Sequence, residues 1–179
     1  MDLNLEHTVA LLSRTPATLN TLLRDLPKDW THTNEGNGTW SAFEIVGHLI
    51  HGEHTDWIPR VKRILESGEG PAFEPFDRGG HASLIHEKTL PQLLDEFAEV
   101  RAMSLSELRS LNLHPEDLSR RGTHPALGTV TVGQLLATWV AHDLNHLHQL
   151  SRVMAHQCHE AVGPWKEYLG VMKCDGHSS

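Results

Sequence analysis

The 179-residue chain has little cysteine and little positive charge, and each shortage excludes a class of protein. Its two cysteines are too few for the disulfide framework of a small secreted domain. Fifteen basic residues stand against 23 acidic ones, so the formal net charge of -8 disfavours a nucleic-acid backbone as a partner. No apolar run approaches the roughly 18 residues that a membrane span requires. We therefore expect a protein that binds neither nucleic acid nor membrane.

The start of the chain also lacks the features of a secretory signal. Acidic residues precede the short apolar run in MDLNLEHTVALL, where a signal peptide would carry basic residues. Together with the scarcity of cysteine, this predicts a cytoplasmic, reduced protein. The length suits one domain over residues 1–179, large enough for a sizeable core.

Motifs of phosphate binding and of serine hydrolases are missing as well. The segment GEGP at residues 68–71 is not a P-loop, and no serine lies in a G-x-S-x-G elbow. Nucleophilic catalysis by a protein side chain therefore has no support, and no phosphate-bearing cofactor is expected.

Strand-like alternation is scarce, whereas apolar residues recur at helical spacing over most of the chain. The pattern predicts a short last helix over residues 163–172 and four long helices, over residues 3–26, 41–65, 89–108 and 131–159. It also allows a small hairpin around Leu127 and Gly128. The expected fold class is all-α, a four-helix bundle with a short extra C-terminal helix.

Three of these helices should begin with capping boxes, in which Ser or Thr is followed three residues later by Glu or Gln. The pairs are Ser41 with Glu44, Thr89 with Gln92, and Thr131 with Gln134.

Prolines predict where the helices break or end. Thr15-Pro16 has the form of an N-cap followed by Pro at the first helical position, so the first helix should restart there. Pro27 should end it, and Pro59 should kink the second helix. The long loop Ser67–Gly80, with its phenylalanines at positions 73 and 76, is of a kind that often forms lids or partner contacts.

Histidine is abundant, with 15 residues, and two of them carry the strongest functional signal. His142 and His146 lie four residues apart in AHDLNHLHQL, so they share one face of the fourth helix. Two imidazoles placed in this way can bind one transition-metal ion. In the second helix His48 lies between apolar neighbours, whereas His51 and His54 drift toward the flank.

Three imidazoles from two helices would leave coordination positions open, as is typical of a catalytic metal site. We therefore take His48, His142 and His146 as candidate ligands of a divalent transition metal. Zinc or nickel is expected, with iron and manganese as alternatives that imidazole also suits. Asp56 and Asn145 are candidates for acid-base help from their positions on the helix faces. The alternative is that these are ordinary core or surface histidines.

Two other metal motifs are weaker. Residues 142–146 resemble the H-E-x-x-H of zinc proteases, but the aspartate is shorter than glutamate and no third ligand follows. We expect Asp143 to orient a ring N–H or to lie on the surface. His156, Cys158 and His159 have a helical spacing that does not converge on one ion, so an exposed helix end is the preferred interpretation there.

The ordered motifs resemble the DinB-like (DinB/YfiT) superfamily of metal-dependent enzymes over nearly the whole chain. They are W-S-x-x-E-I-V-G-H-L at residues 40–49 and H-D-x-x-H-x-x-Q at 142–149, with the Thr15-Pro16 pair, T-V-G-Q-L-L and the closing G-P-W-K-E-Y-L. The resemblance implies a four-helix bundle, a homodimer and a divalent metal held by three histidines, which fall on positions 48, 142 and 146. Relatives include bacillithiol S-transferases, mycothiol-dependent maleylpyruvate isomerases and glutathione transferases.

From the residues and the resemblance we expect a metal-dependent thiol S-transferase or hydrolase. The metal would lower the pKa of a bound thiol or water and so produce a nucleophile near neutral pH. The partners would be a low-molecular-weight thiol and a small electrophile. The alternative is a non-catalytic, stress-associated metal-binding dimer whose metal has no exchangeable coordination position.

Overall fold

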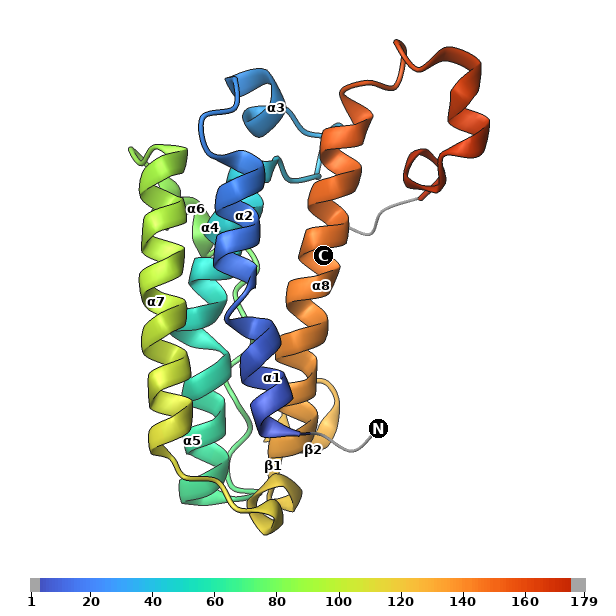
Figure 1. Cartoon of the computed structure of the whole chain (residues 1–179). Coiled ribbons are helices and arrows are strands. Elements are labelled where there is room, and N and C mark those ends of the chain that lie inside the picture. The colour runs from blue at the N-terminus through green and yellow to red at the C-terminus, as the bar shows by residue number, and fades with distance from the viewer. Residues whose placement is uncertain (1–3, 175–179) are drawn as a thin grey trace.

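The computed structural model describes residues 4–174 and forms an elongated bundle of long helices (Figure 1). Two rods of the bundle consist of two consecutive helices each, and two consist of one long helix. The rods are α1 (Leu5–Leu12) with α2 (Thr15–Leu23), α4 (Ala42–Thr55) with α5 (Trp57–Ser67), α7 (Leu90–Ser110), and α8 (Val132–His156). The four-helix bundle that the helical pattern predicts is confirmed, although Leu3, the expected start of the first helix, lies outside the described residues.

Each of the two jointed rods packs against both α7 and α8. The first rod contacts α7 through α2 and α8 through α1, and the second contacts both helices through α4 and α5. Helices α4 and α8, far apart in the sequence, are therefore neighbours in space. No helix within residues 4–174 is long and apolar enough to cross a membrane.

Capping boxes begin the three long helices for which the sequence predicts them. In α4 the Ser41 amide donates to Glu44 Oε2 at 2.8 Å, and in α8 the Thr131 amide donates to Gln134 Oε1 at 2.9 Å. Each box satisfies backbone N–H groups that have no partner inside the helix. The starting points of the two histidine-bearing helices are thus fixed locally.

Pro16 accounts for the break between α1 and α2, but Thr15 is not the cap residue that the sequence suggests. Thr15 lies inside the first turn of α2, and its hydroxyl donates to Asp143 Oδ2 at 2.5 Å. Because proline has no N–H, the Leu12 carbonyl lacks its usual helical donor four residues later. Arg101 of α7 donates to that carbonyl instead, at 2.9 Å.

The second rod breaks one turn before its proline, at Asp56 rather than at Pro59. The proline ring crowds the carbonyl of residue 55 and cannot donate to it. Helix α4 therefore ends at Thr55 and α5 begins at Trp57. The expected kink is present, displaced by one turn toward the N-terminus.

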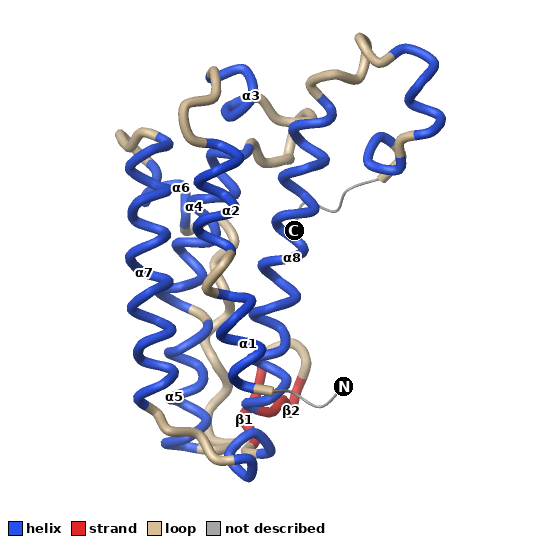
Figure 2. The backbone as a smooth tube through the Cα atoms, in the orientation of Figure 1, coloured by secondary structure: helices blue, strands red, loops and turns tan. Residues whose placement is uncertain are grey.

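Several short elements connect the rods. Pro27 caps α3 (Lys28–His32), which was not expected, and α6 (His81–Ile85) follows the long loop. The 3-10 helix η1 (Pro115–Ser119) precedes an antiparallel hairpin of β1 (Arg121–His124) and β2 (Gly128–Thr131). Figure 2 shows this hairpin at one end of the bundle, where the sequence allows it.

The segment after α8 differs from the expected short α-helix. Helix α8 ends at His156, three residues before the expected boundary. The chain then forms two 3-10 helices, η2 (Gly163–Tyr168) and η3 (Gly170–Met172). Pro164 at the start and Gly170 in the middle interrupt a run that is too short to sustain an α-helix.

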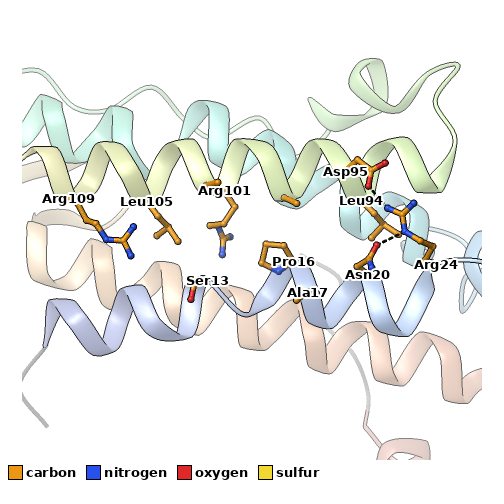
Figure 3. A pocket seen from close by; sticks show the side chains of 12 residues that line it. Ser13, Pro16, Ala17, Asn20, Arg24, Leu94, Asp95, Arg101, Leu105 and Arg109 are labelled. Atoms are coloured by element: carbon orange, nitrogen blue, oxygen red, sulfur yellow. Dashed lines mark hydrogen bonds and ion pairs between the residues drawn. The ribbon is translucent and has the colours of Figure 1, made fainter.

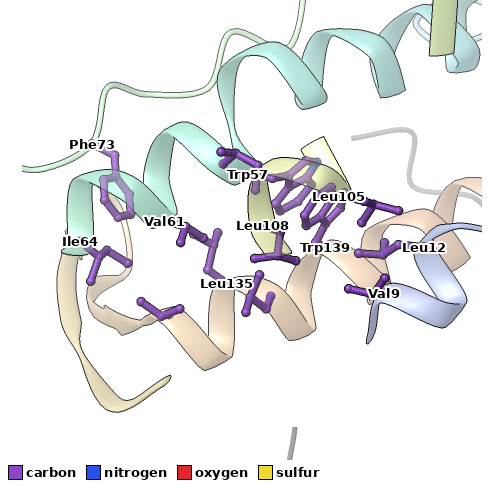
Figure 4. Close-up of a cluster of buried hydrophobic side chains, with 13 residues drawn as sticks. Val9, Leu12, Trp57, Val61, Ile64, Phe73, Leu105, Leu108, Leu135 and Trp139 are labelled. Atoms are coloured by element: carbon purple, nitrogen blue, oxygen red, sulfur yellow. The ribbon is translucent and has the colours of Figure 1, made fainter. Parts of the chain in front are cut away.

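Two apolar clusters fill the bundle, and buried polar residues occur on each rod near the place where the clusters meet. One cluster, drawn in Figure 4, includes Leu12, Trp57, Leu105 and Trp139. The other includes Leu19, Ile50, Phe97 and Leu150. The polar layer comprises Thr15, His48, Glu53, Arg101, Asp143 and His146. Buried polar groups need partners or bound ions, so this layer marks the place to look for function.

Candidate metal centre

Helices α4 and α8 bring three histidines together, with His48 and His146 in the polar layer and the half-buried His142 beside them. The ligating nitrogens of His48, His142 and His146 all lie within 4.8 Å of one another. The Nε2 atom of His142 is 3.1 Å from Nε2 of His48 and 3.1 Å from Nε2 of His146. Two segments distant in the sequence thus present their imidazole nitrogens to a common point.

Packing and a hydrogen bond to Gln149 help to hold the rings. His48 is 3% exposed and His146 is 1% exposed, whereas His142 is half-buried. The Nδ1–H of His146 donates to Gln149 Oε1 at 2.7 Å, which leaves the Nε2 lone pair free to face the other rings. The Trp40 ring lies against His48, with ring centroids 4.6 Å apart. Gln149 had no assigned role in the sequence, although its i+3 spacing from His146 is a usable signal.

Burial keeps the three imidazoles neutral. It lowers the pKa of His48 to about 2, with further contributions from His146 and His142. It lowers the pKa of His142 to about 3, to which His146 and the Arg101 cation add. Burial also lowers the pKa of His146, although the hydrogen bond with Gln149 and the charge of Asp143 oppose the shift. At neutral pH each ring therefore offers a lone pair rather than a charge.

The donor set fits a divalent transition metal. Nitrogens bound to one ion at about 2.0–2.1 Å lie roughly 2.9–3.4 Å apart in octahedral or tetrahedral geometry. The two separations of 3.1 Å fall within that range. Three imidazoles also leave at least one coordination position for water or substrate.

A cavity of about 550 Å³ opens onto His48 and His142. Its walls come from α4 and α5, the long loop, the hairpin and the first turns of α8, and they are mainly apolar. Phe73 and Phe76 line it, so the long loop borders the histidine cluster as expected of a loop at an active-site mouth. The volume is that of a small-molecule site.

Of the two acid-base candidates, Asp56 lines this cavity and Asn145 does not. The Asp56 carboxylate pairs with Arg60 Nε at 2.6 Å. Burial raises the pKa of Asp56, and the Arg60 charge opposes that shift only in part. Asn145 is exposed on α8, because neighbouring helical residues point about 100° apart and His146 takes the inward direction.

The remaining histidines that the sequence singled out lie outside the cluster. His51 is half-buried beside Phe76, and His54 is exposed. At the end of α8, His156 is exposed and Cys158 is half-buried. Over residues 4–174, no second group of three or more ligating side chains converges as the cluster does.

Asp143 neither orients a histidine ring nor lies on the surface, contrary to the sequence-based expectation. It is 2% exposed, and its carboxylate accepts from both terminal nitrogens of Arg101, at 2.6 and 2.9 Å. Sequence reasoning missed Arg101 and its other partner, Glu53. A signal was available, because Arg101 lies four residues after Phe97 and four before Leu105, on the apolar stripe of α7. A charged residue at such a position indicates a buried network.

A second cavity, of about 710 Å³, lies between α2 and α7 (Figure 3). The Arg24–Asp95 ion pair lies at one end of it. None of the three clustered histidines lines this cavity. The chemistry of the cluster therefore belongs to the 550 Å³ cavity.

Known proteins resemble this chain in sequence and in fold. The family model described as the DinB superfamily matches residues 11–150, which include all three clustered histidines. A provisionally named metal-dependent hydrolase of Oceanobacillus iheyensis is 28% identical over 136 residues, covering 74% of this chain and 75% of that protein. YfiT from Bacillus subtilis, described as a probable metal-dependent hydrolase with an unusual four-helix bundle topology, matches with a TM-score of 0.68. That match has 20% identity and covers 88% of this chain and 87% of YfiT, so it supports the fold.

Proposed function

This chain belongs to the DinB superfamily, and from that membership and the site we propose that it is a metal-dependent hydrolase of small organic molecules. The observation that carries the proposal is a buried three-histidine cluster that opens, through His48 and His142, onto a cavity of small-molecule size. The name of the relative from Oceanobacillus iheyensis agrees with this reaction class.

The histidines and their hydrogen-bond partner prepare the site. His48, His142 and His146 would hold a divalent transition metal, which when bound lowers the pKa of a water or thiol at an open position and supplies a nucleophile near neutral pH. Gln149 accepts the Nδ1–H of His146 and so fixes the direction of that ring. The three histidine rings are neutral at pH 7, so they can bind a metal ion without first losing protons.

The cavity walls supply substrate contacts and a proton acceptor. Phe76, beside His48, presents apolar surface that can cover a substrate and exclude water, while the buried Phe73 holds the loop against the core. Asp56, oriented by Arg60, can take a proton from the nucleophile and return it to the leaving group. Its raised pKa makes the carboxyl a better proton carrier near neutral pH than an exposed aspartate.

Hydrolysis of a series of chromogenic esters by zinc-, nickel- and manganese-loaded protein tests the proposal. We expect turnover that a chelator abolishes and added metal restores. Asp56→Asn should lower it by about 10²–10⁴-fold, the usual contribution of a general base. His54→Ala is the matched control, since this exposed histidine of α4 lies outside the cluster. Equal turnover by chelated and metal-loaded protein would contradict the proposal.

Thiol S-transfer is the second candidate, because a cavity of about 550 Å³ admits an organic thiol as well as water to His142. Both reactions share the activation of a nucleophile. Incubation with bacillithiol, mycothiol or glutathione and a small fluorogenic electrophile distinguishes thiol transfer from hydrolysis. Metal-dependent conjugation that outpaces ester hydrolysis would assign transfer as the main reaction.

A stress-associated metal-binding dimer without catalysis remains the competing proposal. In such a protein, the absorption spectrum of bound Co²⁺ would not change when thiol or azide is added, because no coordination position exchanges. An enzyme of either kind should show a spectral change. From the family resemblance we propose that the protein is a homodimer. Sedimentation equilibrium measures the mass of the protein in solution and so tests this.

A further inference from the structure

The guanidinium of Arg101 is buried in the polar layer, and each of its three nitrogens has a partner. Its residue is 1% exposed, and it makes four hydrogen bonds and one further ion-pair contact. Nε donates to Glu53 Oε1 at 3.0 Å, and a terminal nitrogen reaches the same oxygen at 2.8 Å. The terminal nitrogens also donate to the two oxygens of Asp143, at 2.6 and 2.9 Å, and to the Leu12 carbonyl, at 2.9 Å.

The two carboxylates that Arg101 binds belong to the two helices that supply the histidines. Glu53 follows His48 by five residues on α4. Asp143 is next to His142 on α8. Arg101 itself lies on α7, which contributes no histidine to the cluster. One side chain from a third helix therefore connects the two halves of the cluster.

Both carboxylates are also held by a second donor. Trp139 Nε1 donates to Glu53 Oε1 at 3.0 Å, and the Thr15 hydroxyl donates to Asp143 Oδ2 at 2.5 Å. Burial raises the pKa of Glu53, and the attraction of Arg101 opposes that shift. A buried ion network of this kind contributes little net stability compared with apolar residues of similar volume. The network does, however, fix the relative positions of the side chains that it joins, which apolar residues would not do.

From this connectivity we propose that Arg101 is a positioning residue that holds α4 against α8 at the spacing required by the histidine cluster. The inference rests on the proposed metal centre. Ligand distances in a metal site tolerate deviations of only about 0.2 Å. A small shift of α4 would therefore move His48 away from the His142–His146 pair and weaken metal binding without unfolding the bundle.

The test compares Arg101→Met and Arg101→Lys with the control Arg152→Met. Arg152 is also a buried arginine, and its Nε and a terminal nitrogen bind one carboxylate, that of Glu35, at 2.6 to 2.9 Å. Arg152 lies on α8 and Glu35 lies in the loop between α3 and α4. This pair therefore does not join one histidine-bearing helix to the other. Zn²⁺ affinity is measured by competition with a chromophoric chelator, and the site geometry by the Co²⁺ absorption spectrum, below the unfolding temperature of each variant.

Arg101→Met should lose about 10–100-fold in metal affinity and shift the Co²⁺ spectrum, as expected when the support of metal ligands is removed. Arg101→Lys should lose less, because an ammonium keeps the charge but cannot bind both carboxylates in a planar fork. Arg152→Met should keep the wild-type affinity and spectrum even if its unfolding temperature falls.

A second variant keeps the proposal testable if Arg101→Met does not fold. Glu53→Gln/Arg101→Met/Asp143→Asn leaves no uncompensated buried charge, and it should show the same loss of affinity. Wild-type affinity and spectrum in either folded variant would overturn the inference, whatever the change in unfolding temperature. A wild-type protein that binds no divalent metal would instead overturn the proposed function, and this inference with it.

Discussion

At the scale of single residues, burial separates the clustered histidines from the others on the same helices. His48 and His54 both belong to α4, yet His48 is buried and His54 is exposed. Burial lowers the pKa of His48 and so keeps its ring neutral. The same property makes the ring a competent ligand, since a proton and a metal compete for one lone pair.

Replacing His48, His142 or His146 by alanine should remove most of the bound metal and leave the helical content unchanged. Each change deletes one of three donor nitrogens from the cluster and leaves two, too few for a stable site of this type. Elemental analysis and circular dichroism of the purified variants measure both quantities. His54→Ala should retain full occupancy, and full occupancy in His142→Ala or His146→Ala would exclude the site as described.

The stability of the metal-free protein should fall as the pH drops below about 6.5. In the folded state the pKa values of His48 and His142 are lowered to about 2 and about 3, whereas both rings titrate near 6.5 in the unfolded chain. Below that pH the unfolded state binds more protons, so each ring costs up to about 1.4 kcal/mol per pH unit. Urea unfolding at pH 7.5, 6.5 and 5.5 measures the slope. A chelated His48→Gln/His142→Gln variant should have a shallower slope, with His146 still contributing because burial lowers its pKa as well. An unchanged slope would contradict the assignment.

At the scale of elements, the long loop between α5 and α6 joins the core to the site. Phe73 is buried in the apolar cluster at the α5 end, and the Arg60 guanidinium lies 5.2 Å from its ring centre. Phe76 is half-buried and contacts the rings of His48 and His51. The two aromatic residues of one loop therefore have different tasks.

Phe73→Ala and Phe76→Ala should separate packing from function. Phe73→Ala should lower the free energy of unfolding by about 3–5 kcal/mol, the usual cost of emptying a buried aromatic position. Phe76→Ala should cost less stability and change kcat/KM for ester hydrolysis, since its ring borders His48 in the cavity. Urea unfolding measures the stability of both variants, and steady-state kinetics measures their kcat/KM. Unchanged turnover in a destabilised Phe76→Ala would make Phe76 a packing residue as well.

At the scale of the whole molecule, the polar layer divides the bundle between two apolar clusters and ties its rods together. Arg101, Glu53 and Asp143 connect α7, α4 and α8 through buried ion pairs. The Arg101 contact with the Leu12 carbonyl adds the first rod to this network. A metal held by α4 and α8 would add one more connection at the same layer, so metal binding and global stability should be coupled.

Saturating metal should raise the unfolding temperature of the whole bundle. A ligand that binds only the folded state at 100 times its Kd adds about 2.7 kcal/mol of stability. For a protein of this size, that corresponds to roughly 5–10 °C. Differential scanning calorimetry with Zn²⁺ or Ni²⁺ and then with excess chelator measures the shift. The unfolding temperature of His146→Ala should not shift. A wild-type unfolding temperature that changes with neither metal nor chelator would contradict the coupling.

The parts of this protein that the sequence alone determines are those that depend on near neighbours. The capping boxes at Ser41, Thr89 and Thr131 act over three residues, and they begin the helices as expected. The pairing of His142 with His146 on one face follows from helical geometry in the same way. Local hydrogen bonding and periodicity are sufficient for these features, because no distant segment takes part in them.

Tertiary structure decided which distant residues meet and which face is covered. The sequence places Asp56 on a helix face, but only the packing of α5, the loop and the hairpin brings it into the cavity. It likewise allows Asp143 a surface position, whereas in the fold Arg101 from α7 and Thr15 from α2 compensate its buried charge. The physical reason is that burial and charge compensation depend on the other helices, whose positions no short-range pattern contains.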